Sequence, residues 1–87
     1  VKTPAPMLIV QGTADTTVPP ALTDSFVTET ACPIGDSVDY LHVTKATHGT
    51  VVLVSAPTIV AWMTDRLRGD AAPTTCGRAG DVETLTP

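Results

Sequence analysis

Basic residues, aromatic residues and long apolar runs are scarce in this 87-residue chain. It has five Lys and Arg residues against nine Asp and Glu, and one each of Phe, Tyr and Trp. The basic residues are dispersed, so the chain lacks the clustered positive charge that binding to nucleic acid or to an anionic membrane requires. No apolar run approaches the roughly 20 residues of a transmembrane helix. These absences exclude nucleic-acid binding and a membrane-spanning segment as expected roles.

Cysteine is also rare, with Cys32 and Cys76 as the only two. In an exported protein such a pair can form one disulfide that closes a long loop, worth about 4 kcal/mol in the chain-entropy model. The alternative is two unrelated buried thiols. A zinc site is not expected, because two cysteines and two widely spaced histidines lack the paired spacing of zinc ligands.

What the chain does contain is an alternation of strand and helix patterns, and 43% of its residues are hydrophobic. We expect a strand at 7–10, a helix at 21–31, a strand at 38–44 and a helix at 55–68, with 50–55 ambiguous. Ser55 has the features of a helix N-cap, with Pro57 in the first helical turn. The alternation predicts an α/β fold with a parallel sheet. Two parallel strands do not stand alone, so the chain is expected to belong to a larger structure.

One chemically reactive side chain follows each predicted strand. Asp15 follows the first strand, in the stretch QGTADTTVPP, and His48 follows the second. The carboxyl ends of parallel strands share one edge, where ligands bind. An Asp that accepts a hydrogen bond from a His fixes the tautomer of the ring and stabilises the imidazolium formed in proton transfer. The alternative is that Asp15 is an ordinary turn residue and His48 an ordinary surface residue.

The neighbours of these two residues have simpler interpretations. Gln11 and Thr13 flank the acid and can orient it, although ordinary turn hydrogen bonding explains them equally well. His42 lies inside a strand pattern, which favours a packed or half-exposed strand histidine. Three apolar residues that follow His48 form a hypothetical lining of an acyl pocket: Val51, Val52 and Leu53.

Several motifs together resemble the C-terminal part of an α/β-hydrolase, in particular the secretory lipase family that includes the fungal lipase A type. GTADTTVP (12–19) is similar to the family's acid loop, and THG (47–49) to its histidine loop. APTIVAWMTDRLRG (56–69) is similar to its closing helix, and the two cysteines lie where that group has a disulfide. The resemblance covers about residues 4–76.

The resemblance implies a role for each matched residue. Asp15 carries over as the acid of a Ser-His-Asp triad and His48 as its general base. Cys32 and Cys76 carry over as a structural disulfide. The implied activity is hydrolysis of a carboxylic ester, of a lipid or a small acyl ester, in a secreted protein. No cofactor and no metal are implied.

The chain departs from the family pattern at the nucleophile. The G-x-S-x-G elbow is absent, and none of Ser25, Ser37 and Ser55 follows a strand with flanking glycines. We therefore expect residues 1–76 to be the C-terminal part of a hydrolase domain, 77–87 to be a disordered tail, and the rest of the domain to supply the serine. By itself this part should not catalyse acyl transfer. The alternatives are a stand-alone, disulfide-linked exported binding domain without catalysis, or part of a serine peptidase or acyltransferase of the same fold.

Overall fold

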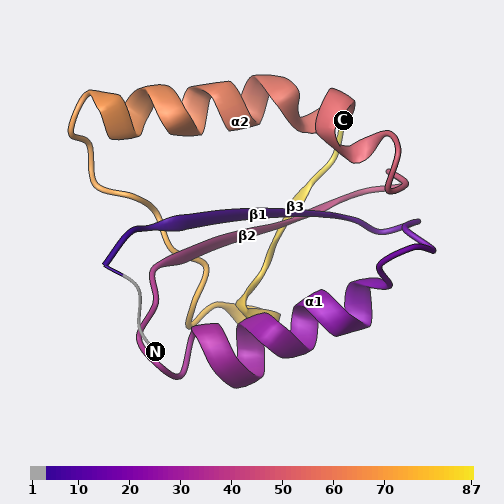
Figure 1. Ribbon diagram of the computed structural model, residues 1–87, viewed down its shortest axis with the longest axis horizontal. Coiled ribbons are helices and arrows are strands. Elements are labelled where there is room, and N and C mark those ends of the chain that lie inside the picture. The colour runs from indigo at the N-terminus through magenta and orange to yellow at the C-terminus, as the bar shows by residue number, and fades with distance from the viewer. Residues whose placement is uncertain (1–3) are drawn as a thin grey trace.

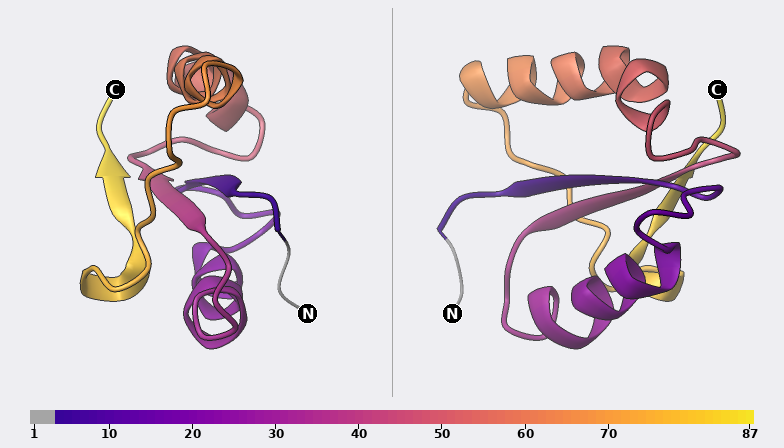
Figure 2. Two further views of the ribbon diagram at one scale, coloured as in Figure 1. Left: turned by 90° about the vertical axis from the view of Figure 1, so that its left-hand side faces the viewer. Right: turned by 45° about the vertical axis from the view of Figure 1, so that its right-hand side comes forward.

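The computed structural model describes residues 4–87 and has three parallel strands in one sheet, in the order β1-β2-β3. The strands are β1 (Met7–Gly12), β2 (Val38–Val43) and β3 (Glu83–Leu85). Helix α1 (Pro20–Phe26), continued by a π-helical turn (Val27–Ala31), lies on one face of the sheet, and α2 (Val51–Leu67) lies on the other (Figures 1 and 2). The predicted α/β fold with a parallel sheet is confirmed.

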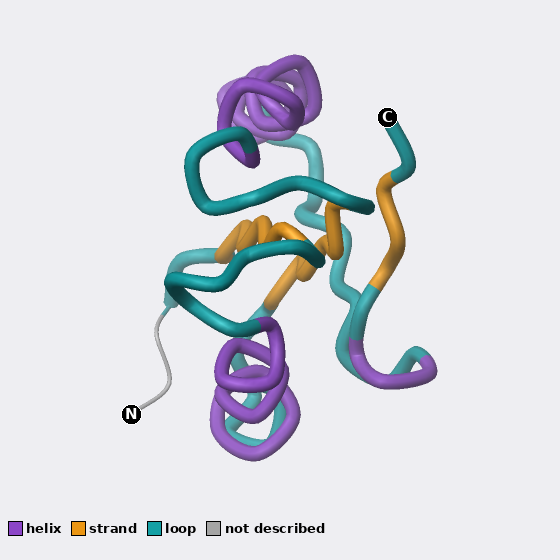
Figure 3. Tube along the Cα trace, turned by 90° about the vertical axis from the view of Figure 1, so that its right-hand side faces the viewer, coloured by secondary structure: helices purple, strands orange, loops and turns teal. Residues whose placement is uncertain are grey.

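The two faces of β2 carry different cores because side chains alternate along a strand. Val38 and Tyr40 are fully buried on the α1 side, where they pack with Val27 and Ala31. Val43 is fully buried on the α2 side. It packs there with Ala46 and Val51. The view along the sheet shows the strands between the two helices (Figure 3). The sheet is therefore covered on both faces, as parallel sheets require.

Helix α2 begins at Val51, so the prediction of a start at Ser55 was wrong. Ser55 lies in the second turn, is fully buried, and donates its hydroxyl hydrogen to the Val51 carbonyl. Pro57 consequently lies inside the helix and not in its first turn. The helix begins early because Val51 packs in the core and its N–H bonds to the Thr47 carbonyl at 3.0 Å.

Much of the apolar surface of α2 faces away from the sheet. Val60, Met63 and Leu67 are 61%, 55% and 90% exposed. Between residues 4 and 87, neither helix has the length and apolar content that crossing a membrane requires.

The C-terminal segment is ordered into a 3₁₀ turn (Ala79–Asp81) and strand β3, which differs from the disorder expected for 77–87. Strand β3 pairs in parallel with β2, with Val43 opposite Leu85, and Leu85 packs against the α2-side core. The pairing partner is about 40 residues away in the chain, which local composition does not reveal.

Cys32 and Cys76 form the expected disulfide, with Cα atoms 5.5 Å apart. It joins the end of the π-helical turn to the segment that leads into β3. Beside it, the Thr75 N–H donates to the Val38 carbonyl at 2.8 Å, and the Thr75 hydroxyl accepts from the Tyr40 N–H at 3.0 Å. The disulfide thus holds the C-terminal segment alongside β2.

Candidate active site

Asp15 and His48 are brought into contact by the parallel pairing of β1 and β2. Gly12, the last residue of β1, lies opposite Val43, the last residue of β2. The two following loops therefore leave the sheet at the same edge (Figure 1). There the His48 Nδ1 atom lies 3.0 Å from the Asp15 Oδ2 atom. The contact joins residues 33 positions apart in the chain.

The carboxylate of Asp15 is buried and well supplied with donors. Its side chain is 4% exposed, and its Oδ1 atom accepts from the N–H groups of Thr17 and Val18 at 2.9 and 2.8 Å. Burial by itself raises the pKa of Asp15. Hydrogen bonds from the Val18 N–H, the His48 ring and the Thr17 N–H outweigh burial, so the pKa lies below its ordinary value. The group is therefore a carboxylate at neutral pH.

The His48 ring faces solvent with one nitrogen engaged. Its side chain is 59% exposed, in contrast to that of Asp15. A carboxylate only accepts hydrogen bonds, so the proton of a neutral ring lies on Nδ1 and points at Oδ2. This tautomer leaves Nε2 with a lone pair. His48 can therefore take up a proton at Nε2 while Asp15 stabilises the resulting imidazolium.

Gly12 lets the strand end approach the histidine loop closely. A Cβ atom on Gly12 would lie 2.2 Å from the Ala46 carbonyl oxygen, which is a severe overlap with backbone. Beside this contact, the Ala14 N–H donates to the same oxygen at 2.9 Å. In the sequence, Gly12 is marked only by its place in the motif similar to the family's acid loop, between a strand and the acid.

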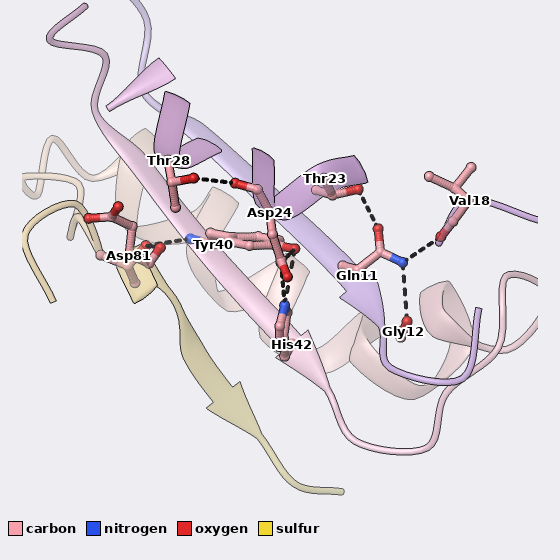
Figure 4. Close-up of polar contacts among 10 residues, drawn as sticks. Gln11, Gly12, Val18, Thr23, Asp24, Thr28, Tyr40, His42 and Asp81 are labelled. Atoms are coloured by element: carbon pink, nitrogen blue, oxygen red, sulfur yellow. Dashed lines mark hydrogen bonds and ion pairs between the residues drawn. The ribbon is translucent and has the colours of Figure 1, made fainter. Parts of the chain in front are cut away.

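Gln11 holds the other side of the acid loop. It is buried, and its Nε2 donates to the carbonyls of Gly12 at 3.1 Å and Val18 at 2.9 Å. Its Oε1 accepts from the Thr23 hydroxyl at 2.5 Å, which ties the loop to α1 (Figure 4). Because Val18 also donates its N–H to Asp15, Gln11 fixes a residue that positions the carboxylate.

The residues predicted to line an acyl pocket differ in burial. Val51 belongs to the core and is 8% exposed, whereas Val52 and Leu53 are 64% and 79% exposed. No pocket forms within the part of the chain that the structure describes. An acyl-binding role for Val51, Val52 and Leu53 stays a prediction.

The second histidine lies in a separate cluster on the α1 side. His42 Nε2 is 2.8 Å from Asp24 Oδ1 and 3.1 Å from the Tyr40 hydroxyl, which also donates to Asp24 (Figure 4). Burial, then the Asp24 carboxylate, raises the pKa of Tyr40 well above its ordinary value. The His42 side chain is 23% exposed, as expected of a packed strand histidine. Asp24 thereby joins α1 to β2.

A metal centre is not supported within residues 4–87. No three of the His, Cys, Asp and Glu side chains described there lie close enough together to hold a metal ion. Both cysteine sulfurs are committed to the disulfide.

The parallel strands and the helix on each face of the sheet are consistent with a segment of the α/β-hydrolase fold. The model of the secretory lipase family matches residues 2–75, which is most of the chain. The chain therefore belongs to the secretory lipase family. Neither a curated protein nor a solved structure matches it.

Proposed function

We propose that Asp15 and His48 are the acid and the general base of a Ser-His-Asp triad in a secreted lipase or esterase. The observation that carries the proposal is the 3.0 Å contact between His48 Nδ1 and Asp15 Oδ2. Membership of the secretory lipase family supports the ester substrate, and the family together with the disulfide supports secretion.

In this proposal His48 acts through Nε2. It removes the proton of a serine hydroxyl as the serine oxygen attacks the ester carbonyl, and it returns that proton to the departing alcohol. It then removes a proton from water, whose oxygen attacks the acyl-enzyme, and the proton passes to the released serine oxygen. Asp15 remains a carboxylate throughout and stabilises the imidazolium.

The nucleophile is proposed to come from a part of the enzyme outside these 87 residues. The printed sequence has no G-x-S-x-G elbow. Of its three serines, Ser55 is fully buried in α2, and Ser25 lies within α1. Ser37 directly precedes β2, at the end of the strand opposite to His48.

The rest of the hydrolase domain is the proposed partner. Strand β1 lies at an edge of the sheet and offers its unpaired side to another strand. Apolar side chains also remain exposed on both helices, among them Leu22 and Phe26 of α1 at 65% and 46%. Exposed apolar residues in this number are typical of surfaces that another element covers.

The test replaces each partner of the pair in the complete lipase that contains this chain. Asp15→Asn and His48→Gln are each expected to lower kcat for ester hydrolysis by about 10³- to 10⁴-fold, as loss of a triad member does. Thermal unfolding is expected to remain cooperative in both variants. The matched control is His42→Gln, the same substitution at the histidine that lies away from the site.

Two results decide whether Asp15 and His48 take part in the mechanism. If His42→Gln retains kcat while His48→Gln loses it, the general base is assigned. A folded Asp15→Asn or His48→Gln variant with full activity removes that residue from the mechanism.

A further inference from the structure

Besides the contact between Asp15 and His48, three hydrogen bonds join the acid loop (13–19) to the chain that ends β2 and leads to α2. This chain between β2 and α2 is here called the histidine loop (44–50). The Thr13 N–H donates to the Val43 carbonyl at 3.1 Å, and the Ala14 N–H donates to the Ala46 carbonyl at 2.9 Å. The Lys45 N–H donates to the Thr13 hydroxyl oxygen at 2.7 Å. Only this last bond uses a side chain, so only it can be removed by substitution without disturbing the backbone.

The donor of that bond has an unusual backbone conformation. Lys45 has a φ of 63°, in the left-handed region that residues with a side chain seldom occupy. Such a residue persists when its surroundings hold it there. The Thr13 oxygen accepts the N–H of Lys45 in this conformation, at the point where the chain turns toward His48.

The remaining hydroxyl contacts of the histidine loop are internal to it. Thr50 Oγ1 accepts from the Thr47 N–H at 2.9 Å, and the two hydroxyls lie 3.0 Å apart. Among the side-chain hydrogen bonds of residues 4–87, those that link the two loops are Thr13 to Lys45 and His48 to Asp15. The first therefore adds, to the two backbone bonds, a side-chain link between the loops that carry the second.

We propose that the Thr13 hydroxyl is a positioning group for catalysis: it holds the histidine loop through Lys45 so that His48 Nδ1 meets Asp15 Oδ2. This inference rests on the proposed function of the pair. Thr13 contacts neither the reacting atoms nor the His48 ring in this arrangement. Its effect should therefore fall on the chemical step, because substrate binding does not depend on the alignment of acid and base.

The experiment compares Thr13→Val with Thr13→Ser in the complete lipase. Valine keeps the branched shape and removes the acceptor, whereas serine keeps the acceptor and removes a methyl group. We expect Thr13→Val to lower kcat about tenfold with KM nearly unchanged, because small misplacement of a catalytic group is costly. We expect Thr13→Ser to restore kcat.

Two further readouts distinguish positioning from general stability. The rate of inactivation by a fluorophosphonate should fall in parallel with kcat, since it needs the same activated serine. The melting temperature should change little, because Thr13 is exposed and water replaces the lost bond. If Thr13→Val fails to fold, Thr13→Ala gives the same test. Alanine also removes the acceptor, and it places no methyl group where the hydroxyl was.

The outcomes separate this inference from the proposed function. Full kcat in Thr13→Val, together with inactive Asp15→Asn and His48→Gln, overturns the inference and leaves the triad proposal intact. An equal loss in Thr13→Val and Thr13→Ser also overturns it, because the hydroxyl is then not the relevant group. Activity in Asp15→Asn and His48→Gln overturns the triad proposal itself. If the losses of kcat in Thr13→Val and Asp15→Asn are not additive in the double variant, this supports action of Thr13 through the Asp15–His48 contact.

Discussion

At the scale of single residues, Gly12 makes the contact between the two loops possible. Its missing side chain leaves the space that the Ala46 carbonyl oxygen occupies, and an added Cβ would lie 2.2 Å from that oxygen. We expect Gly12→Ala to lower the free energy of unfolding by at least about 2 kcal/mol, because backbone on both sides must move to relieve the overlap. Chemical denaturation of the protein, monitored by circular dichroism, measures this.

Gly49 provides the matched control for that substitution. It directly follows His48, yet a Cβ atom there would lie 4.0 Å from the nearest atom outside its chain neighbours, the Thr47 hydroxyl oxygen. Gly49→Ala should therefore leave the free energy of unfolding within about 0.5 kcal/mol of the parent, as surface substitutions do. Equal destabilisation by the two alanines would show that the close approach at Gly12 is not what matters.

The pairing of Asp15 with His48 was predictable from the sequence for a simple reason. Each residue follows a strand, and the carboxyl ends of parallel strands share an edge. The burial of the Asp15 carboxylate and the cross-loop contact of Thr13 with Lys45 were not predictable. Both depend on contacts between segments about 30 residues apart, which no local pattern encodes.

At the scale of elements, α2 shows how tertiary packing overrides a local signal. The stretch SAP resembles a helix start, since Ser is a frequent N-cap and Pro is tolerated in the first turn. The helix nevertheless begins one turn earlier, because Val51 gains burial against Val43 and Ala46. Pro57 is left in the interior, where it cannot donate to the Leu53 carbonyl.

We expect Pro57→Ala to raise the free energy of unfolding by about 1–2 kcal/mol. A proline inside a helix costs about 3 kcal/mol relative to alanine, and part of this is offset because proline also restricts the unfolded chain. Leu53 is 79% exposed, and in the variant its carbonyl regains a helical donor, the N–H of residue 57. Urea unfolding measures the difference.

Thr64→Ala, on the exposed side of the same helix, is the control for helix propensity alone. It should change the free energy of unfolding by no more than about 0.5 kcal/mol. A decrease in stability for Pro57→Ala would indicate that the proline shapes α2 for packing against another part of the domain.

At the scale of the whole molecule, the apolar surface of the chain is incompletely covered. This agrees with the expectation that the chain is a segment of a larger sheet. The sequence predicted this, because two parallel strands need neighbours. The third strand, β3, was missed since its pairing depends on a C-terminal segment held by Thr75 and the disulfide. The apolar residues on the outward side of α2 remain exposed, and periodicity alone does not say which of two apolar faces meets the sheet.

The disulfide is expected to be the largest single contribution to stability that one chemical change can remove. It connects residues 44 positions apart and thereby restricts the unfolded chain. In the chain-entropy model a loop of this length corresponds to about 4 kcal/mol, a large fraction of the 5–15 kcal/mol typical of a folded domain. Replacing both Cys32 and Cys76 with serine should lower the free energy of unfolding by about that amount.

Urea unfolding of the oxidised parent, the parent in excess dithiothreitol and the Cys32→Ser, Cys76→Ser double variant measures this loss. The reduced parent and the double variant should have the same midpoint, because both lack only the cross-link. The Asp15–His48 pair lies at the other end of β2 from the disulfide, since Val38 is beside Thr75 and Val43 is beside the histidine loop. Where the weakened protein is still folded, at low urea, kcat should therefore match the parent. A loss of stability below about 1 kcal/mol would mean that packing of Thr75 against β2 already holds the C-terminal segment in place without the cross-link.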